Sequence, residues 1–169
     1  MKKLVLSTFS AFLLLFVLAG AVFAAPKSAV EREDFKGTLQ AVEVGNPVDF
    51  PIVHVVATGS GRASQLGKFT YSYTVDIHVL NPVTTEAVGT LYYTFVAANG
   101  DKLYSVGDGY STGLTVPGTV DSKRVVEQHV ISGGTGRFAG ATGKFTVDRL
   151  ISNGSTSGTL NGYIVLVDR

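Results

Sequence analysis

The sequence predicts an all-β protein: a single antiparallel closed β-barrel of about eight strands, preceded by a signal peptide. Three observations carry this prediction. Beyond an apolar N-terminal segment, hydrophobic residues recur with a period of two, which is the period of a half-buried strand. Tight-turn sequences separate the alternating segments, and no long apolar stripe at helical spacing occurs among them. Without helices to cover an open sheet, the strands must hide their apolar face by closing or by folding double.

Residues 1–24 have the features of a secretory signal peptide. Two lysines precede an uncharged apolar segment from Leu4 to Leu18, and small residues follow before Ala24. A basic start, an apolar centre and a small-residue exit are the parts of an export signal, so we expect cleavage near Ala24 and a secreted or periplasmic protein. The alternative is an uncleaved membrane anchor, because about 20 apolar residues can span a bilayer. The Met-Lys-Lys start favours bacterial export.

Composition excludes several classes of protein. Removing residues 1–24 takes away two basic residues and no acid, so 14 basic side chains become 12 against 13 acidic ones, a net charge of −1. No nucleic-acid partner is expected, because such binding needs a basic excess on one face. The chain has no cysteine, so burial and hydrogen bonding must stabilise it without disulfides. No later apolar run reaches membrane-spanning length, so we expect no stable membrane insertion after processing.

Two segments show the strand pattern most clearly. In 66–79, aromatic and aliphatic residues that include Tyr71 and Tyr73 alternate with polar ones, and in 90–98 Tyr93 shares a face with other apolar side chains. The eight expected strands are 35–44, 51–59, 66–79, 90–98, 102–110, 123–131, 144–151 and 158–167. The expected domain is 35–169, with a flexible lead-in at 25–34 and the longest loop at 111–122.

Two Asn-Gly pairs predict hairpins. Asn99-Gly100 stands between two alternating segments, and both central residues of a type I′ turn need a positive φ, which Asn and Gly tolerate. Asn153-Gly154-Ser155 matches a glycosylation acceptor, but with bacterial export we interpret it as a second hairpin turn.

The segment 131–143, ISGGTGRFAGATG, resembles a run that joins two neighbouring strands in the allene oxide cyclase and dirigent barrels. Gly67-x-Phe69, the segment 97–101 (AANGD) and Gly158-x-Leu160-x-Gly162 resemble bacterial secreted members of that superfamily. The likeness covers about residues 35–167 and implies the barrel fold. It does not imply one function, because the superfamily contains a fatty-acid-epoxide cyclase, dirigent proteins that orient radical coupling, and many members with no established activity.

The glycines of 131–143 also have a physical interpretation. They can adopt the positive φ of a bulge or tight corner, and Phe138 can turn inward as a plug. A phosphate-binding loop would instead have to open a helix, whereas 144–151 alternates like a strand.

The sequence lacks the residue patterns that several kinds of functional site require. His54, His78 and His129 stand singly in separate strands, so we expect no metal site and no cofactor. No Gly-x-Ser-x-Gly elbow is present, and we assign no catalytic residue. Asp76 and His78 share a face, but it is the predicted wet face of their strand.

The candidate site consists of charged residues that lie on the same strand face as apolar residues. Glu127 and His129 share a strand face with aliphatic residues, and Arg149 does so on the following strand. If these faces look inward, Glu127 and Arg149 form a buried pair, since a buried charge needs a partner. The alternative is an outward pair on a mixed surface. The candidate ligand-binding residues are Tyr71, Tyr73, Tyr93, Glu127, His129 and Arg149, because tyrosines add orienting hydroxyls.

Three functions stay open at this point. The first is a non-catalytic barrel that holds a small apolar ligand. The second is a cyclase or isomerase acting on an unsaturated lipid-like substrate, with Glu127 stabilising developing charge. The third is an envelope interaction module with a filled lumen, which could form a homo-oligomer. An outer-membrane barrel is disfavoured, because the chain ends Val167-Asp168-Arg169 without an aromatic residue and no aromatic girdle is evident.

Overall fold

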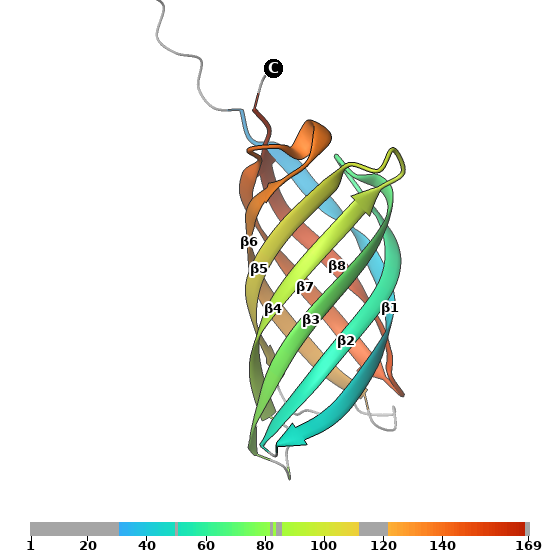
Figure 1. The fold of residues 1–169 in the computed structure, drawn as a ribbon, viewed down its shortest axis with the longest axis vertical. Helices are drawn as coiled ribbons and strands as arrows, with labels where there is room; N and C mark the ends of the chain where they lie inside the picture. The colour runs from blue at the N-terminus through green and yellow to red at the C-terminus, as the bar shows by residue number, and fades with distance from the viewer. Residues whose placement is uncertain (1–30, 50, 82, 84–85, 112–121, 168–169) are drawn as a thin grey trace, which may run out of the picture.

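The computed structural model describes residues 31–49, 51–81, 83, 86–111 and 122–167, and within them eight antiparallel strands form one closed barrel (Figure 1). The strands are β1 (Glu33–Asp49), β2 (Ile52–Ala63), β3 (Gly67–Asn81), β4 (Glu86–Ala97), β5 (Lys102–Ser111), β6 (Ser122–Gly134), β7 (Thr142–Ser152) and β8 (Ser155–Val165). One short 3-10 helix, η1 (Gly136–Phe138), stands between β6 and β7. The predicted all-β class and eight-stranded closed barrel are therefore confirmed.

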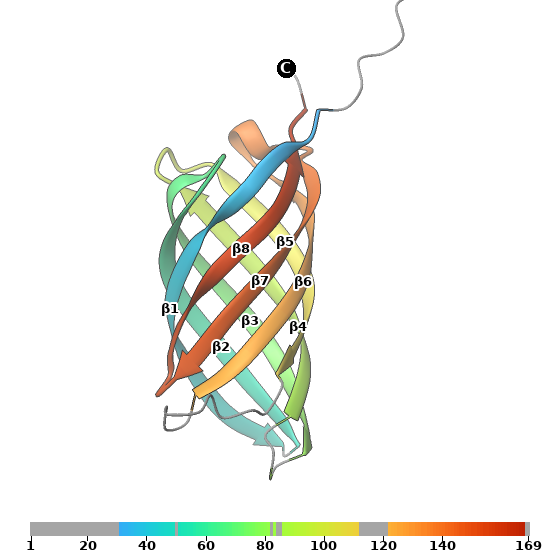
Figure 2. The ribbon, with the colours of Figure 1, turned by 180° about the vertical axis from the view of Figure 1, so that it is seen from behind.

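The barrel is a simple meander. Each strand pairs with the next along the chain, and β8 returns to pair with β1, from Glu33 opposite Ile164 to Val42 opposite Ser155 (Figure 2). The connections β2–β3, β4–β5 and β6–β7 lie at one end, which is the upper end in Figure 1, and the start of β1 lies there too. Closure leaves no unpaired sheet edge, which is how a single layer of strands protects its backbone hydrogen-bonding groups.

All eight strands fall where the alternation predicts them, with different ends. The first differs most: it begins at Glu33, two residues inside the expected lead-in, and continues to Asp49, past the expected end at 44. Its register shifts between Pro47 and Asp49, next to the proline, whose missing N–H cannot continue a ladder. The predicted signal peptide lies outside the described residues, as do 112–121, most of the predicted longest loop. No helix in the described ranges is long and apolar enough to cross a membrane.

The two Asn-Gly hairpins differ in turn type. Asn153 and Gly154 both have a positive φ, 50° and 74°, and join β7 directly to β8 as a two-residue turn. Between β4 and β5 only Gly100 has a positive φ, 87°. The hairpin is confirmed there, but the type I′ turn is wrong. The Gly100 N–H donates to the Ala97 carbonyl at 2.9 Å, as in a four-residue β-turn. This connection is one residue longer than a type I′ hairpin loop, and its last residue is a glycine with left-handed backbone conformation.

Aromatic rings fill the upper half of the lumen. Phe95 contacts Phe35, Phe69 and Phe145, with ring centroids 5.4–6.4 Å apart and steep interplanar angles. Phe138 of η1 closes this end and is fully buried, as predicted for a plug.

The glycine-rich run takes positive φ values at Gly133, Gly136, Gly140 and Gly143, which confirms the expected corner. At Gly136 a side chain would also collide, because a Cβ there would lie 1.6 Å from the Oδ1 atom of Asp101. The Asp101 carboxylate accepts the Arg137 backbone N–H at 3.1 Å, so this corner and the β4–β5 turn are held together.

Candidate functional site

The structure brings all six predicted site residues together inside the barrel. Tyr71 and Tyr73 come from β3, Tyr93 from β4, Glu127 and His129 from β6, and Arg149 from β7. None of these side chains is more than 4% exposed, and Glu127 is fully buried. Of the two alternatives for Glu127 and Arg149, the inward pair is the one observed.

Glu127 is surrounded by hydrogen-bond donors. Its Oε1 accepts from the Arg149 Nε at 2.7 Å. Its Oε2 accepts from the Tyr93 hydroxyl at 2.8 Å and contacts the His129 Nε2 at 3.0 Å. Both oxygens of this buried carboxylate are therefore occupied by protein groups, which is the condition for keeping a charge in a dry interior.

Arg149 joins Glu127 to a second carboxylate. Its Nη1 donates to Glu43 on β1 and to the Thr156 hydroxyl on β8 at 3.1 Å, and its guanidinium lies 5.2 Å from the Tyr73 ring centroid. The Tyr73 hydroxyl also donates to Glu43. Sequence reasoning missed Glu43, although it shares strand parity with the buried residues Leu39 and Ala41.

Electrostatics keeps these groups in defined charge states. Burial alone would raise the pKa of Glu127, but the charge of Arg149 and the hydrogen bonds from His129 and Tyr93 outweigh it and lower that pKa below its usual range. Burial would lower the pKa of Arg149, but Glu127 and the other anionic neighbours raise it well above its ordinary value. Burial raises the pKa of Tyr71, Tyr73 and Tyr93. At neutral pH the pair is ionised and the phenols are protonated.

The Tyr71 hydroxyl differs from its neighbours. The Tyr71 ring contacts the rings of Tyr73 and Tyr93, with centroids 6.3 and 5.8 Å away, yet its hydroxyl has no hydrogen-bond partner among the described residues. A buried hydroxyl without a partner is costly, so this position has an unused hydrogen-bonding capacity.

Glycines on neighbouring strands make room for the cluster. Gly107 lies opposite His129 and Gly158 lies opposite Arg149. A Cβ on Gly107 would be 2.5 Å from the His129 Nδ1, and one on Gly158 would be 2.5 Å from the Arg149 Cβ. The large polar side chains therefore lie against bare backbone, which fixes their position across the lumen.

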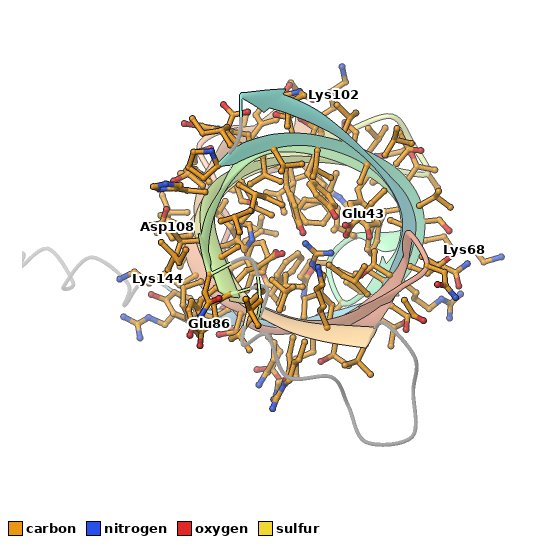
Figure 3. All side chains as sticks on the ribbon, turned by 90° about the horizontal axis from the view of Figure 1, so that it is seen from below. Glu43, Lys68, Glu86, Lys102, Asp108 and Lys144 are labelled. Atoms are coloured by element: carbon orange, nitrogen blue, oxygen red, sulfur yellow. The ribbon has the colours of Figure 1, made fainter. Side chains whose placement is uncertain are left out.

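A cavity of about 660 Å³ occupies the lower end of the lumen, below this cluster. Its walls are mainly aliphatic and come from seven strands; they include Val53, Val55, Val75, Ile77, Val79, Ala87, Leu91, Val125 and Ile151. Glu43 and Arg149 are the charged groups at its inner end, and Lys123 lies on the wall near the start of β6. Seen from this end, Glu43 points inside the ring of strands while Lys68, Lys102 and Asp108 point outward (Figure 3). Of the six predicted residues, only Arg149 lines the cavity.

The other candidate chemistries lie elsewhere. His78 is exposed, and the His54 Nδ1 contacts the Asp76 Oδ1 at 2.7 Å on the outer wall, so these residues are on the predicted wet face. The Ser105 hydroxyl lies 3.3 Å from the His129 Nδ1, but Ser105 is buried and does not line the cavity. Within the described ranges, no three His, Cys, Asp or Glu residues are placed to hold a metal ion.

Comparisons with known proteins support the fold. No protein-family model and no curated protein matches the sequence. Among solved structures, the chain is similar to one described as the pterocarpan synthase dirigent protein GePTS1, with a TM-score of 0.51 and 12% sequence identity over 88% of this chain and all of that one. The likeness shows that this chain has the same kind of eight-stranded barrel as a dirigent protein, and at this identity it shows the fold alone.

Proposed function

We propose that the chain is a secreted protein that binds a small, largely apolar molecule in the lower half of its barrel, without transforming it. The cavity of about 660 Å³ carries this proposal. Ligand pockets in proteins typically measure about 300–1,000 Å³ and are lined by apolar side chains with a few polar groups that fix orientation. The aliphatic wall with Glu43 and Arg149 at its inner end has this composition.

The state of the buried acid supports a binding role over a catalytic one. A general acid or base must reach the substrate, and its pKa must lie near the working pH. Glu127 is fully buried, has both oxygens occupied and has a lowered pKa. The charged network therefore closes the inner end of the cavity with fixed polar groups.

Filling the cavity tests the proposal. Gly45 lines the cavity, and a Cβ there would meet Val53 and Val55 at 3.6 Å, which is ordinary contact, so we expect the side chain of Gly45→Leu to occupy part of the cavity. We expect this variant to lose a ligand that native mass spectrometry detects on protein purified from its own host. Val44→Leu adds volume on the exposed outer face of the same strand and should retain it. Unmodified protein that carries no compound and binds no apolar compound would contradict the proposal.

An isomerase or cyclase is the second candidate, and the position of Glu43 and Arg149 at the cavity favours it. A carboxylate and a guanidinium fixed at the end of an apolar cavity could stabilise charge that develops in an unsaturated substrate. On any substrate found, Glu43→Gln should then lower kcat by about 100-fold or more, the effect of losing one preorganised group. Unchanged turnover in Glu43→Gln would exclude this mechanism.

Export is part of the proposal and has its own test. We expect the mature N-terminus near residue 25, because the small residues before it suit a signal peptidase. N-terminal sequencing of protein from the periplasm or culture medium measures this directly. A chain that keeps residues 1–24 would support the membrane-anchor alternative.

A further inference from the structure

We infer that the cavity selects an amphiphile whose polar head is a hydrogen-bond donor, most favourably a protonated amine, and that it disfavours a carboxylate head at its inner end. This inference rests on the proposed binding function and adds the class of ligand.

The first step is the unequal number of charges. Two carboxylates, Glu43 and Glu127, share the single guanidinium of Arg149. The Arg149 Nε is used by Glu127, and its Nη1 is divided between Glu43 and Thr156. The cluster therefore holds two carboxylates for one guanidinium in a mostly buried site, where electrostatic interactions are strong.

The second step locates that charge at the cavity. Glu127 lies behind the wall with both oxygens occupied, whereas Glu43 lines the cavity and its side chain is 11% exposed. Both hydrogen bonds to Glu43, from Tyr73 and Arg149, go to Oε1. Oε2 accepts no hydrogen bond from the described residues. An acceptor with a negative charge and a free oxygen faces a space large enough for a ligand.

The third step concerns the head group that this oxygen would bind. An ammonium group has three donors and no acceptor, so it can donate a hydrogen bond to the Glu43 Oε2. A carboxylate would instead bring a third negative charge to one guanidinium.

The remaining charged group of the cavity fits the same orientation. Lys123 lies near the start of β6 at the lower end, paired in the sheet with Ile151, far along the strand from Glu127. An anionic group on a ligand would therefore be attracted to the outer part of the cavity. The apolar body would lie between, along the valine and isoleucine side chains.

Three matched compounds test the inference at pH 7: n-decylamine, n-decanol and n-decanoate, each below its micelle concentration, titrated into the mature protein by isothermal calorimetry. We expect decylamine to bind about tenfold or more tightly than decanoate, because its ammonium group is opposite in charge to Glu43 whereas a carboxylate head has the same charge. Glu43→Gln removes the charge but keeps an acceptor, so it should weaken decylamine binding about tenfold and change decanol binding little. Asp108→Asn removes a charge from the outer wall and should change neither.

The outcomes separate the two proposals. If none of the three compounds binds, the proposed binding function fails and this inference fails with it. If decanol binds but decanoate binds as tightly as decylamine or more tightly, the binding function stands and the selectivity is wrong. The ranking on the unaltered protein does not depend on any variant, so it decides the matter even if Glu43→Gln folds poorly.

Discussion

The two halves of the lumen solve the same packing problem in opposite ways. The upper half is filled by phenylalanine rings and closed by Phe138, so that Phe35, Phe95 and Leu103 are fully buried. The lower half is lined by smaller aliphatic side chains, which leave about 660 Å³ unfilled. The charged cluster separates them. Closing the barrel therefore leaves room for a ligand wherever inward side chains are too small to meet across it.

Two leucine-to-alanine substitutions, one in each half of the lumen, measure this contrast most directly. Leu103→Ala opens a new void in the filled half and should lower the free energy of unfolding by about 4–5 kcal/mol. Leu91→Ala enlarges a space that already exists and should cost about 2–3 kcal/mol, at the low end for such changes. Urea unfolding followed by circular dichroism provides both values. Equal losses would show that the two halves are packed alike.

Breaking the cluster tests the boundary between the halves. Arg149→Met leaves Glu127 buried and unpaired, so we expect a loss of about 3–5 kcal/mol at pH 7. In the unaltered protein, folding lowers the pKa of Glu127. The stabilisation by the pair is therefore fully present above the pKa of the unfolded state, about 4.3, and it is lost as the pH falls through the lower pKa of the folded state. In Arg149→Met burial raises that pKa instead, so the penalty should shrink as pH falls from 7 to 5.

The matched control for that variant removes both charges of the Glu127–Arg149 pair. Arg149→Met combined with Glu127→Gln should recover part of the loss, because the fully buried carboxylate is gone and only Glu43, at the cavity, still lacks its cation. A penalty in Arg149→Met that is the same at pH 7 and pH 5 would contradict a buried ionised Glu127.

Two glycine substitutions test how the upper end is closed. Gly136→Ala meets both a positive φ of 54° and the Asp101 carboxylate, so we expect a loss of about 2–3 kcal/mol. Gly100 also has a positive φ, but a Cβ there would meet nothing within 4 Å, so Gly100→Ala should cost only about 1 kcal/mol. Thermal unfolding of the two variants ranks them, and the reverse order would contradict the collision with Asp101.

The smallest expected effect is at Tyr71. Tyr71→Phe removes a hydroxyl that has no partner in the described ranges, so stability should change by less than about 0.5 kcal/mol. Tyr93→Phe removes a donor to the buried Glu127 and should cost about 1.5–3 kcal/mol. Denaturant unfolding of both compares them, and a large loss in Tyr71→Phe would show that its hydroxyl has a structural partner.

Strand parity explains which parts of this arrangement the sequence could predict. Alternation places Tyr71 and Tyr73 correctly because the opposite face of β3 is polar, and it places Tyr93 correctly because Leu91, Phe95 and Ala97 share its face of β4. For Glu127 both faces of the strand contain valines, so parity alone could not decide between an inward and an outward pair. The structure decides it through packing partners on other strands, which a single strand's pattern does not contain.

Glu43 shows where such reasoning fails. Its neighbours Val42 and Val44 are each 60% exposed, so the apolar residues of this stretch face outward and the charge faces inward, opposite to the usual pattern. Parity with Leu39 and Ala41 was the available signal. The cavity could not be predicted either, because an unfilled volume depends on the summed size of inward side chains from seven strands.

The ladder between β1 and β8 sets the order in which the barrel can be completed. Seven ladders join strands that are consecutive in the chain, but Glu33 cannot meet Ile164 until the last strand has been synthesised. Every shorter nascent chain carries two open edges, which are templates for pairing with other chains. A premature stop codon within β8 would therefore cause aggregation rather than a merely weaker barrel, and a chaperone that shields β1 would have its greatest effect before that strand emerges.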